Sequence, residues 1–199
     1  MAGAPAPLHD ALGLLEVDSI ALGYRVVDAL VKKSPVVLLE ANVVEPGKFL
    51  VLFTASVAEV EEAFTEAMEV AGDSCIDHLF LPLVHSAILS GLAGHVDLDE
   101  PDTVGIVEGR VVSSTLKACD RALKDADVTL AGLRITPGLG GKAYFVVHGQ
   151  QHDVETSLER AGSVLSETDQ LMRVECIAAP HPDFLEMVLR PAPFQLERS

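Results

Sequence analysis

The spacing of apolar and polar positions predicts a strand and then a helix at the start of the chain. Residues 11–17, ALGLLEV, are an apolar run with the length of a buried strand. A helix is expected over 19–33, capped by Asp18 or Ser19 and ended by Pro35. Its apolar residues lie on one stripe, as in an amphipathic helix; they are Ile20, Tyr24, Val27 and Val31.

A hairpin, a second helix and a last strand follow. Residues 36–44, VVLLEANVV, and 48–55, KFLVLFTA, are apolar strands separated by a Pro-Gly turn. Ser56 and Glu59 have the spacing of a capping box, which predicts that a helix begins there. With a final strand near 76–83, the order is β-α-β-β-α-β, the split-βαβ plan.

The same pattern returns in the second half of the chain. A shift of 92 residues places 10–38 on 102–130 with the apolar positions in register. Seven residues are identical at this shift: Asp10, Gly13, Glu16, Asp28, Lys32, Val36 and Leu38 meet Asp102, Gly105, Glu108, Asp120, Lys124, Val128 and Leu130. After the Pro-Gly turn the shift becomes 94, so Gly47-Lys48 meets Gly141-Lys142. The chain is therefore a tandem duplication.

The duplication predicts the fold class and the domains. We expect an α+β protein with two tandem ferredoxin-like domains, each an antiparallel sheet with helices on one face. Residues 93–102, AGHVDLDEPD, are mostly polar and contain Pro, as in a linker. We place the first domain at 8–97 and the second, with a C-terminal tail, at 98–199.

Composition narrows the possible partners. The formal net charge of −16 disfavours binding to nucleic acid or to anionic lipid, because no basic stripe is available. No apolar run reaches the ~18 residues of a membrane span, and MAGAPAPLHD lacks the features of a signal peptide. Three separated cysteines suit a reducing cytosol better than a disulfide scaffold.

The sequence contains no motif for catalysis or metal binding. Residues 138–143, GLGGKA, match part of a phosphate loop, but Thr136 replaces the required earlier Gly and a strand is expected after Lys142. The cysteines form no C-x-x-C pair, and Cys119 is expected to be a small buried hydrophobe on a helix. We expect no catalytic residue, no metal ligand and no cofactor.

Several stretches are specific enough to compare with known families. They are LGLLEVDSIALGYRVVDALVKKSPVVLL and PGKFLVLF in the first copy, and VGIVE, DRALKDADVTL and GLGGKAYFVVHG in the second. Together they resemble the bacterial microcompartment (BMC) shell domain over about residues 8–190. The closing CIAAPHPDF is similar to the family's I-P-R-P-H segment, with Ala178 and Ala179 in place of Pro and Arg. The unpermuted strand order is similar to that of single-layer tandem members, such as the propanediol-utilisation shell protein.

The resemblance implies a homotrimer in which six domains form a flat, pseudo-hexameric tile. The hairpin loops would surround a central pore for small metabolites or ions. The expected pore-lining residues are Val44, Glu45, Pro46, Gly47 and Lys48 in the first copy and Thr136, Pro137, Gly138, Leu139, Gly140 and Gly141 in the second. Without the resemblance, a tight Pro-Gly hairpin would explain both loops.

Glu45 departs from one member of the family. In the propanediol-utilisation relative, a Cys directly before Pro-Gly-Lys binds an iron–sulfur cluster on the axis, so Glu45 argues against a cluster here. Three Glu45 carboxylates would form an acidic ring that favours cations, unless Lys48 folds back toward the loop and offsets the charge. A solvated glutamate without a selective role is the alternative.

The resemblance also implies contacts at the tile edge. In the family, a lysine near the end of the first helix meets its counterpart across the tile boundary, and Lys32 and Lys124 occupy this position. His85 and His181 lie in the closing segments, where the usual Arg is missing. Cations that stabilise a helix C-terminus are the alternative for the two lysines.

We expect a structural shell protein rather than an enzyme. It would lie in the cytoplasm, in a microcompartment shell, and would assemble with itself and with hexameric shell proteins. One alternative is a redox tile with a metal or iron–sulfur centre on the three-fold axis. Another is a small-molecule sensor with paired ferredoxin-like domains.

Overall fold

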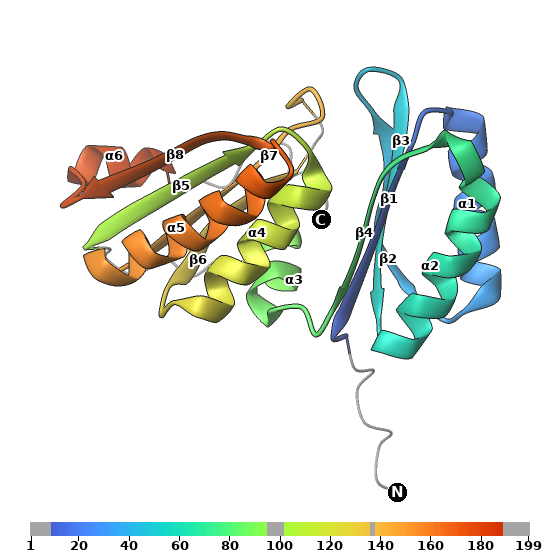
Figure 1. The fold of residues 1–199 in the computed structure, drawn as a ribbon, viewed down its shortest axis with the longest axis horizontal. Coiled ribbons are helices and arrows are strands. Elements are labelled where there is room, and N and C mark those ends of the chain that lie inside the picture. The colour runs from blue at the N-terminus through green and yellow to red at the C-terminus, as the bar shows by residue number, and fades with distance from the viewer. Residues whose placement is uncertain (1–8, 95–101, 136–137, 189–199) are drawn as a thin grey trace, which may run out of the picture. The chain divides into compact units, whose positions relative to one another are not determined.

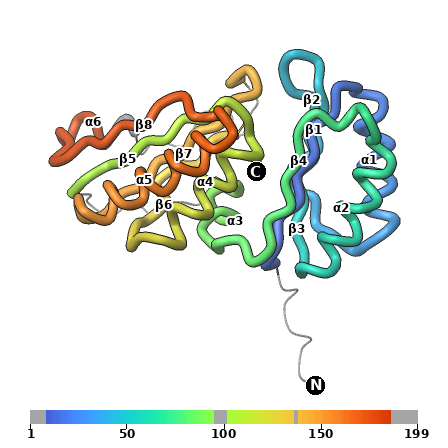
Figure 2. The backbone as a smooth tube through the Cα atoms, in the orientation of Figure 1, coloured from blue at the N-terminus to red at the C-terminus, as the bar shows by residue number. Residues whose placement is uncertain are grey.

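The structure is a computed structural model that describes residues 9–94, 102–135 and 138–188. The chain forms two compact units that meet between Val84 and His85 (Figures 1 and 2). The first unit contains β1 (Ala11–Val17), α1 (Ile20–Lys33), β2 (Val37–Val44), β3 (Lys48–Ala55), α2 (Val57–Ala71), the 3-10 turn η1 (Gly72–Ser74) and β4 (Cys75–Pro82). The second contains α3 (Ser86–Leu92), β5 (Thr103–Gly109), α4 (Val112–Asp125), β6 (Thr129–Ile135), β7 (Ala143–Gly149), α5 (Gln151–Glu167), β8 (Leu171–Ala178) and α6 (Pro182–Val188).

Each unit has the predicted β-α-β-β-α-β order and an antiparallel sheet. The strand orders are β2-β3-β1-β4 and β6-β7-β5-β8, so the two sheets have the same topology. In each unit the two long helices cover one face of the sheet, α1 and α2 in the first and α4 and α5 in the second (Figure 1). The predicted α+β class with two tandem domains is confirmed.

Local signals in the sequence set the helix starts. The Ser19 side chain accepts a hydrogen bond from the Leu22 N–H, which caps α1. The Glu59 carboxylate accepts hydrogen bonds from the backbone N–H and the hydroxyl of Ser56, and these bonds lower the pKa of Glu59. The expected capping box therefore begins α2.

The buried face of α1 differs from the stripe that its apolar residues indicate. Gly23, Val26 and Leu30 are the buried residues of this helix. Tyr24, by contrast, is 65% exposed, and Ile20 and Val31 are also exposed. Val27 of the stripe does pack against the core, and the Tyr24 ring lies 5.1 Å from that of Phe49. The apolar stripe of α1 therefore marks only in part the face that packs on its own sheet.

The segment after β4 belongs to the second unit. Helix α3 packs on β6 and α4, with Ile88 fully buried and Gly91 against Leu130 and Leu133. The expected boundary between residues 97 and 98 lies outside the described residues and stays a prediction.

Candidate functional site

The first hairpin loop joins β2 to β3. Val44 and Lys48 are the last paired residues of the two strands, and the Gly47 N–H donates to the Val44 carbonyl at 3.1 Å. Gly47 has a φ of +85°, which an L-residue rarely adopts, so the turn requires glycine here. Val44 is buried, whereas Glu45 and Pro46 are exposed at the tip.

The second hairpin loop joins β6 to β7 and repeats the turn glycine, but its hydrogen bond is made one residue later. The Lys142 N–H donates to the Leu139 carbonyl at 3.3 Å, and Gly141 has a φ of +88°. Gly138 and Gly140 are exposed. Thr136 and Pro137 lie outside the described residues. Because β7 follows Lys142 directly, the loop leads into a strand and not into the helix that a phosphate loop requires.

A lysine–glutamate pair lies behind each loop. Lys48 Nζ is 2.8 Å from Glu16 Oε1 on β1, and Lys142 Nζ is 3.1 Å from Glu108 Oε1 on β5. The Glu16 side chain is 3% exposed and that of Glu108 is 37% exposed, so the first pair is the buried one. In both copies the residue after the loop is thus anchored to an inner strand of its sheet, β1 or β5.

This anchoring decides where Lys48 points. Its ammonium pairs with Glu16 instead of folding toward the exposed carboxylate of Glu45. The condition under which Lys48 would offset the charge of Glu45, that it folds back toward the loop, is therefore not met in this structure.

The expected edge lysines each pair with an aspartate one helical turn earlier. Lys32 Nζ is 2.6 Å from Asp28 Oδ2, and Lys124 Nζ is 2.6 Å from Asp120 Oδ2. The first pair is open to solvent, with side chains 71% and 60% exposed, whereas Asp120 is only 8% exposed. The two helices thus carry the same pair in different surroundings.

The two histidines of the closing segments also have matching roles. His85 Nδ1 accepts from the Ala87 N–H at 3.3 Å, and His181 Nδ1 accepts from the Asp183 N–H at 3.2 Å. Each therefore caps the short helix that follows it. In addition, the His85 backbone N–H donates to Asp120 Oδ1 at 2.8 Å, so His85 and Lys124 share one carboxylate.

The spacing of residues along the chain did not indicate the roles of Glu16, Glu108, Asp28 and Asp120. All four belong to the residues that are identical between the two copies. Their lysine partners, too, are repeated in both copies. The repeated charges were thus a signal for these pairs, because unrelated solvated charges have no reason to recur in register.

Comparison with known proteins places this architecture in a family. The BMC domain model matches residues 11–84 and again residues 103–180. The chain belongs to the bacterial microcompartment shell-protein family. It is a tandem member with two BMC domains, and its place is the shell of a microcompartment.

Individual relatives have the same tandem arrangement. The chain is 36% identical over 174 residues to the bacterial microcompartment shell protein PduT of Citrobacter freundii, covering 87% of this chain and 95% of that protein. It is 35% identical to a microcompartment protein of Desulfitobacterium hafniense of known crystal structure, with a TM-score of 0.84 over 90% of this chain and 99% of that one. The fused permuted hexameric shell protein MSM0275 of the RMM microcompartment shares the fold at 20% identity, with a TM-score of 0.59 over 79% of this chain and 84% of its own.

The cysteines of this BMC protein lie away from both loops. Cys75 is on β4, Cys119 on α4 and Cys176 on β8. Cys119 is fully buried, as expected, and burial raises its pKa far above the usual value of a thiol. Burial also raises the pKa values of Cys75 and Cys176, with smaller contributions from nearby carboxylates. All three thiols are therefore protonated and poorly nucleophilic at neutral pH.

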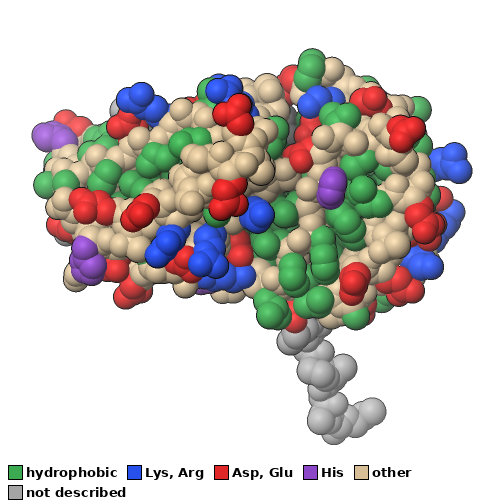
Figure 3. Space-filling view, in the orientation of Figure 1, with side chains coloured by type: hydrophobic (Ala, Val, Ile, Leu, Met, Phe, Trp, Pro, Cys, Tyr) green, Lys and Arg blue, Asp and Glu red, His purple; other side chains and the backbone are tan. Residues whose placement is uncertain are grey.

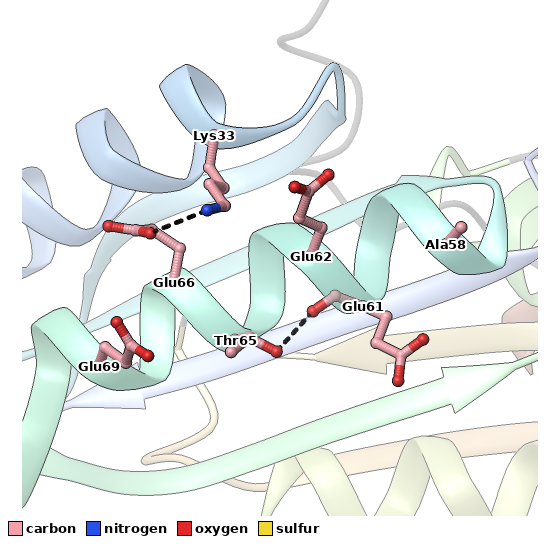
Figure 4. Close-up of a pocket in the computed structure, with 7 residues that line it drawn as sticks. All are labelled: Lys33, Ala58, Glu61, Glu62, Thr65, Glu66 and Glu69. Carbon is pink, nitrogen blue, oxygen red and sulfur yellow. Dashed lines mark hydrogen bonds and ion pairs between the residues drawn. The ribbon is translucent and has the colours of Figure 1, made fainter.

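The first BMC domain carries an acidic hollow along α2 (Figure 4). It is lined by Lys33, Ala58, Glu61, Glu62, Thr65, Glu66 and Glu69. Lys33 Nζ lies 3.8 Å from Glu66 Oε2, and the remaining glutamates of the hollow are exposed. This is the solvated acidic face of a surface helix. In the described part of the chain, no three His, Cys, Asp or Glu side chains are grouped as metal ligands would be.

No helix among the described residues is both long and apolar enough to cross a membrane. Large hydrophobic side chains are nevertheless exposed, and all of those found in the described ranges belong to the first BMC domain. They are Ile20, Tyr24, Val31, Val37, Leu38, Val43, Ile76 and Leu83. Figure 3 shows hydrophobic side chains gathered on one face of this domain, where Figure 1 draws β4.

Proposed function

We propose that three copies of the chain form a pseudo-hexameric shell tile with a central pore for small metabolites or ions. The observation that carries this proposal is the equivalence of the two hairpin loops. Each turns through a glycine with positive φ, and each is anchored through a lysine to an inner strand of its sheet, β1 or β5. Three chains would supply six such loops around one axis, which is the arrangement expected of a closed ring.

The pore would be lined by residues 44–48 and 136–141, with the Glu45 carboxylates as its charged group. Because Lys48 is held by Glu16, three Glu45 side chains would give an acidic ring on the axis. Such a ring favours cations over anions. The second loop is two residues longer and has no Glu. It would alternate with the first loop around the axis and reduce the symmetry from six-fold to three-fold.

Exposed apolar surface supports self-association. Tyr24 and Leu83 are each 65% exposed, which is unusual for such large side chains in a domain that stays alone. Assembly would cover this surface. The tile would then pack beside hexameric shell proteins, with the side chains of Lys32, Lys124, His85 and His181 as the proposed edge contacts.

The tile is proposed to be a passive barrier with a pore, without catalysis and without a cofactor. The cysteines lie on strands and a helix instead of in the loops, so the axis would be lined by carboxylates. Thiolates are the usual ligands of an iron–sulfur cluster, and this favours the passive tile over the redox alternative.

Spin labels test whether the first loop lies at the axis. Glu45→Cys, in a chain with Cys75→Ala and Cys176→Ser, would place three equivalent labels near the pore. We expect the distances between labels, measured by pulsed dipolar spectroscopy, to be short in this variant. A label at Lys32→Cys in the same background is the control and should give longer distances, because the rim is far from the axis. Distances at residue 45 equal to or longer than those at residue 32 would contradict the proposed pore.

A further inference from the structure

The two BMC domains differ in how much of their first helix is covered. At the shift of 92 residues, Tyr24 corresponds to Leu116 and Val31 to Leu123. Tyr24 is 65% exposed and Val31 41% exposed, whereas Leu116 is fully buried and Leu123 is 6% exposed. The same positions that are covered on α4 are therefore open on α1.

Part of what covers α4 is the segment that follows the first domain. His85 donates its backbone N–H to Asp120 on α4, and α3 then packs on α4 and β6. A side chain at Gly91 of α3 would collide with Leu130 of β6, so the helix lies directly on this strand. Leu130 is 3% exposed as a result, while its counterpart Leu38 on β2 is 38% exposed.

The chain contains a second segment of the same design. His181 caps α6 through Nδ1 as His85 caps α3, and both helices have seven residues. Unlike α3, α6 lies on the sheet that precedes it in the chain, because Leu185 packs against Val104, Ala131 and Val146 of the second sheet. Docking on a second copy would exchange this contact for a new one.

We infer that α6 of one copy docks on α1 and β2 of a second copy of this chain. In this contact the carboxylate of Asp28 accepts the backbone N–H of the neighbouring His181, as Asp120 accepts that of His85. The inference rests on the proposed trimer and names the contact that closes it. Since the donor segment and the acceptor face are different surfaces of one chain, the contact is head-to-tail and can close a ring.

The charges of α1 fit this role. Asp28 already holds Lys32 through Oδ2 at 2.6 Å, as Asp120 holds Lys124 through Oδ2, which leaves Oδ1 in the position that His85 uses on Asp120. The Asp28 side chain is 60% exposed. Docking of α6 would bury the Asp28 side chain together with Leu38 and Tyr24, whose exposure in the single chain is also explained by the missing second copy.

Asp28→Ala tests the contact, with Lys32→Ala as the matched control. We expect Asp28→Ala to raise the concentration at which half of the chains are trimeric by at least about tenfold, because a charge-assisted hydrogen bond is lost at each interface. Lys32→Ala breaks the same exposed ion pair but keeps the acceptor, so it should change that concentration by less than about threefold. Sedimentation velocity over a concentration series measures both, and circular dichroism checks that each variant is folded.

A chain ending at Pro180 provides the second arm of the test. It lacks the docking segment and should associate at least as weakly as Asp28→Ala. Combining the two changes should add nothing further, because both remove one contact. If Asp28→Ala weakens the shortened chain by the same factor as the full chain, or leaves the full chain unchanged, the inference is wrong. A wild-type chain that does not associate at all would instead contradict the proposed tile itself.

Discussion

Lys48→Met is expected to destabilise the protein by about 3 kcal/mol, since it leaves the Glu16 carboxylate buried without its partner. Glu16 is 3% exposed and Lys48 Nζ lies 2.8 Å from it. Methionine keeps the length and apolar stem of lysine, so the loss reports on the charge and not on a cavity. Urea unfolding at one fixed protein concentration measures the change, because association also contributes to stability.

The second BMC domain supplies the control for this prediction. Lys142→Met breaks the corresponding pair with Glu108, but these side chains are 43% and 37% exposed. The loss of folding stability caused by Lys142→Met should therefore stay below about 1 kcal/mol. Glu16→Leu combined with Lys48→Met should recover most of the lost stability, because no charge is then buried. Equal costs for the two lysine variants would show that burial of Glu16 does not matter.

Gly23→Ala is expected to cost about 2 kcal/mol, although alanine is the better helix former. A Cβ at Gly23 would overlap the ring of Phe49, which is a buried core side chain and cannot move away freely. The second domain solves the same packing differently, with Thr115 and Ala143 at the two corresponding positions. A larger residue on the helix is thus matched by a smaller one on the strand.

This exchange of side-chain size predicts that the effect of Gly23→Ala on stability changes sign when Phe49 is also replaced. In a Phe49→Ala background the obstacle is gone, so Gly23→Ala should stabilise the protein by about 1 kcal/mol through its helix propensity. Thermal or urea unfolding of the four combinations measures the coupling. If Gly23→Ala costs the same in both backgrounds, the ring of Phe49 is not what limits residue 23.

Much of the fold could be predicted from the sequence because its signals are local. The strand over 11–17 and the strand over 48–55 coincide with β1 and β3, and the capping box at Ser56 begins α2. Because the two copies align in register, each helix and strand could be predicted twice, once from each copy. Turn glycines were also recognisable, since positive φ leaves few other choices.

The buried face of α1 could not be predicted from the spacing of its apolar residues. Ile20, Tyr24 and Val31 have helical spacing, but the helix packs on its sheet through Gly23, Val26 and Leu30. Apolar spacing cannot separate burial within a domain from burial against another copy. Here the glycine that allows close packing on Phe49 carries no hydrophobic signal at all.

The charged pairs behind the loops were missed for a different reason. Glu16 and Lys48 are far apart in the chain and meet only because β1 and β3 are neighbours in a defined register. Such a contact follows from the sheet topology and not from the spacing of residues along one element. The repeated identities contained the information, but the sheet was needed to connect them.

The oligomeric state of the untagged protein, purified under argon, tests the central claim most directly. Native mass spectrometry of the 21.1 kDa chain should show a trimer near 63 kDa (3 × 21.1) without additional mass. A trimer with the mass of a metal or an iron–sulfur cluster would contradict the passive pore and support a redox tile. A monomer or a dimer would contradict the trimeric tile, and with it the pore that six loops are proposed to form.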